Sequence, residues 1–125
     1  MKTECIGDHV KMNGKIYPCT VSLAMDLMGG KWKTVILYHL KERPKRYSEI
    51  LKEMHTVTEM TLSLQLKKLE KDGLIKRKVF GEKPPVKVIY SLTAFGETIV
   101  PVLEAITAWG NLVAEQKGEL VTNSL

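Results

Sequence analysis

The most constraining feature of this sequence is a regular apolar stripe that ends at a glycine and is followed at once by a different hydrophobic period. Over residues 59–72, leucines recur at spacings of four and three residues, the repeat of one buried face of an α-helix. Thr58 is a favourable N-cap, and Gly73 stands where helices commonly end in the left-handed conformation. The stripe consists of Leu62, Leu66 and Leu69. Residues 59–72 are therefore predicted to form a helix with one face in a core.

A two-stranded hairpin is predicted directly after this helix. Residues 75–80 and 86–92 are rich in β-branched and aromatic residues, and apolar and polar positions alternate in the second run. The segment GEKPP at residues 81–85 separates the two runs and has the glycine and prolines typical of a loop.

Helical periodicity predicts further helices at about residues 20–28, 31–41 and 49–54. Ser48 is the expected N-cap of the third of these, which a short turn joins to the helix at 59–72. A long final helix follows the hairpin.

The final helix is expected over about residues 94–116, with Thr93 as its N-cap. Pro101 should kink or split it, because proline removes one backbone hydrogen bond.

The apolar stripe of this final helix is long for a helix that covers so small a body. We therefore expect a two-fold homodimer formed through the N- and C-terminal helices; the alternative is that this helix only covers its own chain. The stripe consists of Ile99, Leu103, Ile106 and Val113, with Trp109 beside it.

This order of elements predicts a mainly α protein with a small antiparallel β hairpin (α+β), arranged as a winged helix-turn-helix. The domain is expected at residues 18–116, after an N-terminal arm (1–17) that is ordered in part at most, and before a tail (117–125). In such folds the second helix of the pair enters the major groove of double-stranded DNA, and the hairpin, or wing, lies along the backbone or minor groove.

Charge supports a nucleic-acid partner. The net charge is +5, and residues 67–87 hold eight lysines and arginines against three acidic residues. Residues 31–46 are also basic, whereas residues 93–125 are acidic. Segregated charge is common on ordinary solvated surfaces as well. The charge therefore favours DNA binding without establishing it.

The expected DNA-contacting residues lie on the helix at 59–72 and on the wing. Residues near the start of a recognition helix reach base edges, and basic residues further along meet phosphates. The alternatives are a merely solvated helix face and lysines that protect a strand edge. The candidates are Thr58, Glu59, Met60, Ser63 and Lys67 on the helix, and Arg77, Lys83 and Lys87 on the wing.

Cys19 is a candidate redox or electrophile sensor. It lies just before the first predicted helix, and a thiol at a helix N-terminus tends toward the reactive thiolate. A buried, inert thiol is the alternative. Cys5, His9 and Cys19 match no compact zinc spacing and lack a fourth ligand, so no metal or other cofactor is expected.

Other classes of protein are disfavoured. The sequence has no P-loop, GxGxxG, HExxH or GxSxG motif, and Glu49 and Glu53 are interpreted as surface charge, so an enzyme is not expected. No apolar run approaches the roughly 20 residues of a membrane span, and no apolar secretory segment opens the chain, so a cytoplasmic protein is expected. The remaining alternative is a winged helix that binds proteins and not DNA.

Five stretches share their order and spacing with a known family: GGKWKTVIL (29–37), KRYSEI (45–50), LKKLEKDGLIKRKVF (66–80), PPVKVIYSLTAFG (84–96) and PVLEAITAWG (101–110). Over about residues 19–113 the chain resembles the HxlR-type regulators, a branch of the MarR-like winged-helix proteins. Met60 and Leu64 depart from positions that look polar in that pattern, although Met60 suits a thymine methyl group.

The resemblance implies a homodimer that binds operator DNA through the helix at 59–72 and the wing at 81–86, and that represses, or in some members activates, nearby genes. Several members respond to electrophiles, quinones, aldehydes or disulfide stress through a cysteine placed like Cys19. This implies an oxidant or electrophile as inducer. A switch would use Cys19 alone, Cys19 with Cys5, or Cys19 across the dimer; Cys5 matches nothing in the family pattern.

Overall fold

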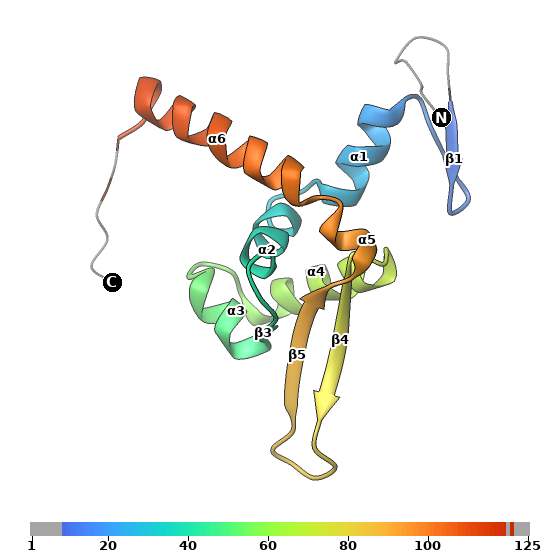
Figure 1. Ribbon diagram of the computed structural model, residues 1–125, viewed down its shortest axis with the longest axis vertical. Helices are drawn as coiled ribbons and strands as arrows, with labels where there is room; N and C mark the ends of the chain where they lie inside the picture. Colours follow the sequence, from blue (N-terminus) through green and yellow to red (C-terminus); the bar gives the residue numbers. More distant parts are fainter. Residues whose placement is uncertain (1–8, 120, 122–125) are drawn as a thin grey trace.

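The computed structural model describes residues 9–119 and 121. A helical body carries a long hairpin at one end, and the last helix leaves it at the other (Figure 1). The predicted mainly α architecture with a small antiparallel sheet is confirmed. The elements are β1 (Val10–Met12), β2 (Lys15–Tyr17), α1 (Thr20–Met28), α2 (Lys33–Leu40), β3 (Lys45–Arg46), α3 (Tyr47–Glu53), α4 (Glu59–Lys71), β4 (Ile75–Phe80), β5 (Lys87–Leu92), α5 (Ala94–Glu97) and α6 (Val100–Lys117).

The core is formed by α2, α3 and α4 packed against the base of the β4–β5 hairpin and the first turns of α6. The leucine stripe of α4 faces it as predicted, with each of the three leucines at most 1% exposed. Full burial of such a side chain contributes about 1.5–3 kcal/mol. The core therefore fixes which face of α4 points outward. The largest fully buried side chains are Ile36, Leu37, Ile50, Leu62, Leu66, Leu69, Ile75 and Leu103.

The ends of α4 are those that the sequence predicts. The Thr58 Oγ1 accepts a hydrogen bond from the Thr61 backbone N–H at 3.1 Å, which confirms the N-cap. Gly73 follows the C-cap with a φ of +79°, a conformation that glycine adopts without a β-carbon clash.

The start of α3 differs from the prediction. The helix begins at Tyr47 with Arg46 as its N-cap, so Ser48 is not the cap. The Glu49 carboxylate accepts a hydrogen bond from the Arg46 backbone N–H at 3.1 Å. This bond satisfies an otherwise unpaired donor and allows the helix to begin earlier than the serine suggested.

The wing belongs to a sheet of three strands, in the order β3-β5-β4, whereas the sequence predicted only a hairpin. β3 has two residues and pairs antiparallel with β5, Lys45 opposite Tyr90 and Arg46 opposite Ile89. Two residues are too few to show an alternating pattern, so this strand had no recognisable sequence signal. Its pairing ties the segment between α2 and α3 to the base of the wing.

Part of the segment interpreted as an arm is a second hairpin. β1 and β2 pair with Val10 opposite Tyr17, and Asn13 and Gly14 at the turn have φ values of +50° and +79°. Positive φ at both central residues is the requirement of the tightest hairpin turn, and Asn-Gly is its favoured sequence. Residues 1–8 of the expected arm lie outside the described residues.

The predicted final helix is split, as Pro101 indicated. Thr93 caps the short α5, accepting a hydrogen bond from the Gly96 backbone N–H at 2.9 Å. A separate helix, α6, then begins at Val100, and Pro101 lies in its first turn, where a missing backbone N–H costs least. Of the α6 side chains, only Leu103 is fully buried, because the rest of the helix projects away from the body (Figure 1).

Candidate DNA-binding surface

The two helices α3 and α4 are joined through one tyrosine. The Tyr47 hydroxyl donates a hydrogen bond to the Glu59 carbonyl oxygen at 3.1 Å, and it lies 3.1 Å from the Ser63 Oγ. The phenol therefore links the start of α3 to the first two turns of α4. Tyr47 was not among the predicted contact residues, because a tyrosine in a helical stretch is ordinarily interpreted as a packing residue.

The start of α4 is strongly exposed. Met60 is 83% exposed and Leu64 is 50% exposed. Met60, Leu64, Lys67 and Lys71, at spacings of four, three and four, follow the ridge opposite the buried leucines. Glu59 and Lys67 are also exposed. A helix that presents both apolar and charged groups along one ridge is suited to a partner of mixed chemistry, such as the major groove.

Two of the predicted contact residues already have local partners. The Thr58 hydroxyl caps α4 and donates to the Thr61 Oγ1 at 2.9 Å. The Ser63 hydroxyl is half-buried beside Tyr47. These two side chains hold the helix in place. Of the predicted base-contacting residues, Glu59 and Met60 have exposed side chains that no described hydrogen bond engages.

The register of β4 with β5 separates the basic residues of the wing into two faces. Residues opposite each other share a face of a sheet. Arg77 lies opposite Tyr90, which is buried in the core, so Arg77 is on the face that packs against the helices. Lys78 and Lys87 lie on the other face, opposite Ile89 and Phe80.

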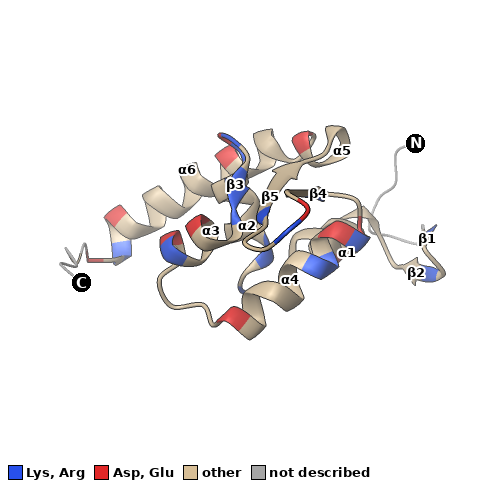
Figure 2. Ribbon diagram, turned by 90° about the horizontal axis from the view of Figure 1, so that it is seen from below, with Lys and Arg blue, Asp and Glu red and all other residues tan. Residues whose placement is uncertain are grey.

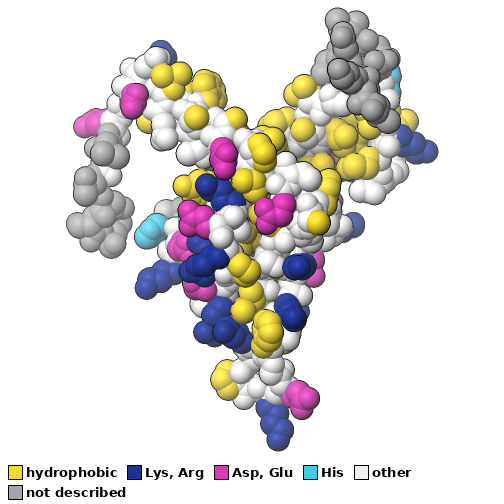
Figure 3. Space-filling model, viewed as in Figure 1, with side chains coloured by type: hydrophobic (Ala, Val, Ile, Leu, Met, Phe, Trp, Pro, Cys, Tyr) yellow, Lys and Arg dark blue, Asp and Glu magenta, His cyan; other side chains and the backbone are white. Residues whose placement is uncertain are grey.

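The wing candidates therefore do not form one flat patch. Lys78 is held on its face by the aromatic ring of Phe80, 5.2 Å from the ammonium to the ring centroid. Lys83 lies in the exposed loop between the strands. Figure 3 shows dark blue basic side chains on the lower body and at the tip of the wing.

The basic run at residues 31–46 is less available to DNA than its composition suggested. Lys45 is only 6% exposed and binds the Glu53 carboxylate, with 3.0 Å from its Nζ to Oε2. Arg43 binds Glu49 at 2.6 Å from Nη2 to Oε2. The two glutamates, which the sequence indicated to be surface charge, are thus partly exposed and each paired with a cation.

These contacts shift the pKa values of both carboxyl groups downward. The hydrogen bond from Lys45 is the main cause that lowers the pKa of Glu53. The hydrogen bond from Arg43, together with that from the Arg46 backbone N–H, lowers the pKa of Glu49 to about 2. His39 completes the group, with its Nδ1 3.4 Å from the Glu53 Oε1. The cluster fastens β3 to α3 beneath the wing.

The comparisons with known proteins agree with this geometry. A model of the HxlR-like helix-turn-helix family matches residues 27–118. The chain belongs to the HxlR-like helix-turn-helix family. It is 47% identical over 92 residues to the HTH-type transcriptional regulator YdeP of Bacillus subtilis strain 168, a match that covers 74% of this chain and 71% of YdeP. The chain is thus a DNA-binding transcriptional regulator with a winged helix-turn-helix, and its relatives are regulators with no enzymatic role in their names.

Solved structures give the same result for this HxlR-like protein. The redox regulator HypR superposes in its reduced form with a TM-score of 0.73 at 38% identity, over 77% of this chain and 94% of HypR. In its oxidised form the TM-score is 0.71 at 39% identity, over 75% of this chain and 96% of HypR. Nothing in these comparisons supports a winged helix that binds only proteins.

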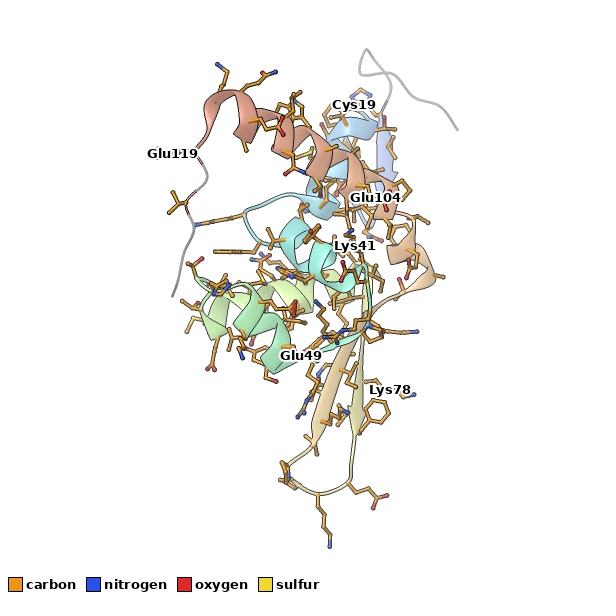
Figure 4. All side chains as sticks on the ribbon, turned by 60° about the vertical axis from the view of Figure 1, so that its left-hand side comes forward. Cys19, Lys41, Glu49, Lys78, Glu104 and Glu119 are labelled. Carbon is orange, nitrogen blue, oxygen red and sulfur yellow. The ribbon has the colours of Figure 1, made fainter. Side chains whose placement is uncertain are left out.

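Cys19 occupies the N-cap of α1 in this HxlR-like chain. It is 7% exposed and disulfide-bonded, and its Sγ lies 3.8 Å from the Ser22 Oγ. The chain's other cysteine, Cys5, lies outside the described residues. Figure 4 shows Cys19 at the far end of the molecule from Lys78 of the wing. Cys19 is therefore remote from the basic side chains of the wing.

An apolar surface follows α6 and α1, away from the wing. Trp109 is 68% exposed and Leu112 is 47% exposed on α6, and Val21 and Met25 are more than half exposed on α1. Figure 3 shows hydrophobic side chains gathered on these two upper arms, and Figure 2 shows acidic positions along α6 and basic ones on β3 and α4. Apolar patches of this kind mark interaction surfaces.

Two further findings concern metals and membranes. Within residues 9–119 and 121, no group of three or more His, Cys, Asp or Glu side chains is placed to hold a metal ion. Within the described part of the chain, no helix is both long enough and apolar enough to cross a bilayer.

Proposed function

We propose that this chain is a homodimeric, cytoplasmic regulator that binds a pseudo-palindromic operator. Through this operator it represses, or activates, the neighbouring genes. The observation that carries the proposal is the exposed start of α4, held by Tyr47 and flanked by a basic wing. Two-fold dimers of helix-turn-helix proteins place their recognition helices one DNA turn apart, so the operator would contain two related half-sites.

Within each half-site, base contacts come from the first turns of α4. Glu59 accepts a hydrogen bond from a cytosine amino group, and Met60 contacts a thymine methyl group. Thr58 and Ser63 border the same groove while they hold the helix. Lys67 on α4 and Arg77, Lys83 and Lys87 on the wing neutralise phosphates, which sets register and salt dependence but not sequence.

The dimer forms through α1 and α6. Beyond its first turns α6 has an apolar surface that its own chain does not cover, including Ile106 at 38% and Val113 at 38% exposure. Pairing with the same surface of a second copy removes these side chains from water, at roughly 25 cal/mol for each Å2 buried. A two-fold arrangement then directs both α4 helices to one side of the DNA.

Cys19 serves as a thiol switch in this proposal. Its position at the N-cap of α1 and its disulfide in the structure support this role, as does the similarity to a redox regulator. On oxidation two thiols lose two protons and two electrons to an oxidant such as a peroxide or a diazene, and a sulfur–sulfur bond forms. Because α1 belongs to the dimer surface, this change alters the placement of the two α4 helices.

The test is a fluorescence-anisotropy titration of the full chain against DNA from upstream of its own gene, with selection from random DNA as a second source. Reduced and oxidised protein are compared, together with Cys19→Ser and Cys5→Ser. Tight, salt-sensitive binding that changes on oxidation only in chains that keep Cys19 supports the whole proposal. Binding indifferent to oxidation removes the switch alone. No enrichment of any sequence in the selection refutes operator binding.

A further inference from the structure

A polar cavity lies at the opposite end of α4 from its exposed start. It measures about 530 Å3, and its walls come from the β1–β2 hairpin, α1, the first residue of α2 and the C-terminal end of α4. Its charged lining has an excess of two positive charges. The charged side chains are Lys15, Lys33, Lys68, Lys71, Asp26 and Asp72.

One wall is already organised by hydrogen bonds around Asp26. The buried Tyr17 donates its hydroxyl hydrogen to the Asp26 Oδ2 at 2.5 Å, and the Lys15 Nζ lies 3.7 Å from the same oxygen. Lys33 donates to the Asp26 carbonyl oxygen at 3.3 Å. The Tyr17 bond is the main cause that lowers the pKa of Asp26, so this carboxyl group stays ionised at neutral pH.

The opposite wall has positive charge that the described protein does not neutralise. Lys68 and Lys71 stand in the last turn of α4, and no described carboxylate lies within 4.0 Å of either ammonium group. Asp72, the C-cap of α4, follows Lys71 directly, and its charge contributes to raising the pKa of Tyr17. A cavity with two unpaired lysines on one side and a fixed carboxylate on the other is suited to a ligand with one anionic end and one hydroxyl-bearing end.

We propose that this cavity binds a small phosphorylated sugar or polyol. Lysines bind phosphate as point charges, and the two aspartates accept hydrogen bonds from hydroxyl groups of the ligand. Recognition of a dicarboxylate would favour the planar fork of arginine, and no arginine is among the described lining residues. The volume lies within the range of about 300–1,000 Å3 typical of small-molecule sites.

Such a ligand would bridge the recognition helix to α1 and the N-terminal hairpin. Since α1 belongs to the proposed dimer surface and α4 to the proposed DNA surface, binding here couples the two. This consequence rests on the proposed function. By linkage, a ligand that changes the affinity for operator DNA has its own affinity changed by the same factor.

Calorimetric titration of the full chain with glucose 6-phosphate and ribose 5-phosphate tests the site without DNA. Glucose and inorganic phosphate are titrated separately at the same ionic strength. We expect saturable binding of at least one sugar phosphate, more tightly than either component. Lys68→Gln with Lys71→Gln should weaken it by at least about tenfold, because each lysine–phosphate hydrogen bond is a charge-assisted one. Lys52→Gln with Lys117→Gln, which removes the same charge from exposed positions elsewhere, should leave it unchanged.

Three results would overturn the site: no binding of either sugar phosphate, equal weakening in both double variants, or inorganic phosphate binding as tightly as the sugar phosphates. A second measurement separates this site from the DNA-binding proposal. The ratio of operator affinities with and without the bound sugar phosphate should differ from one in the unmodified chain and equal one in the Lys68/Lys71 variant. A chain that binds the sugar phosphate but no DNA refutes the proposed function and leaves the site intact.

Discussion

The two faces of the wing make a sharp prediction for neighbouring residues. Arg77 lies on the face that packs against the helices, opposite the buried Tyr90. Lys76 lies opposite Ser91 and lines a small cavity beside Pro44 on the other face. Both side chains are exposed and basic. Replacing each in turn by glutamine removes one charge from adjacent positions of one strand, but only Arg77 is among the residues that we propose to neutralise a phosphate.

The magnitude follows from counterion release. Each neutralised phosphate contributes about 0.9 to the slope of log affinity against log salt, and a two-fold dimer has two copies of Arg77, so Arg77→Gln should reduce the slope by about 1.8. Between about 50 and 200 mM salt, the affinity of the unmodified chain should therefore fall roughly 12-fold more than that of the variant. Lys76→Gln should retain the slope of the unmodified chain.

Anisotropy titrations at four salt concentrations with one operator fragment give both slopes. Circular dichroism of the variants establishes that the fold is unchanged. A slope for Arg77→Gln equal to that of the unmodified chain would show that Arg77 does not neutralise a phosphate. An equal fall for both variants would show that the charge of the wing acts as a whole, and that Arg77 has no contact that Lys76 lacks.

Three further predictions concern stability. A β-carbon at Gly96 would lie 2.0 Å from a backbone carbonyl oxygen, so Gly96→Ala should cost about 1–3 kcal/mol, seen as a lower urea midpoint. Lys45→Ala leaves Glu53 without its buried partner and should cost about 3 kcal/mol, whereas replacing both residues with methionine should cost much less; equal losses in urea would contradict this. The pKa of Glu49 is lowered in the folded state, so its stabilisation is complete above pH about 4.5 and is lost as the pH falls toward about 2. Arg43→Gln should remove most of that dependence from urea midpoints measured over this range.

Much of the fold was predictable because its elements have strong local signals. The leucines of α4, the cap at Thr58, Gly73 and the alternation in β5 each act within a few residues, and each prediction from them is confirmed. The division of the last helix followed from Pro101 alone. Signals of this kind depend on a few neighbouring residues, so contacts with distant parts of the chain do not override them.

The features that the sequence did not predict depend on contacts between residues far apart in the chain. Lys45 looked like one more surface cation, and only the pairing of β3 with β5 shows that its side chain is enclosed beside Glu53. The role of Tyr47 depends on a residue sixteen positions away. The β1–β2 hairpin is a different case, since Asn13-Gly14 was a local signal that the overall composition of the segment concealed. The DNA-contacting assignments remain predictions.

The attachment of α6 has a mechanical consequence. The helix has 18 residues, a length of about 27 Å, and only its first turns are anchored in the core. It therefore acts as a lever arm: a tilt of about 10° at its base displaces its far end by about 5 Å. Because Tyr47 links α3 to α4, we expect these two helices to move together. In a dimer joined along α6, a small rotation near Pro101 would change the distance between the two α4 helices. That distance must match one turn of DNA, about 34 Å.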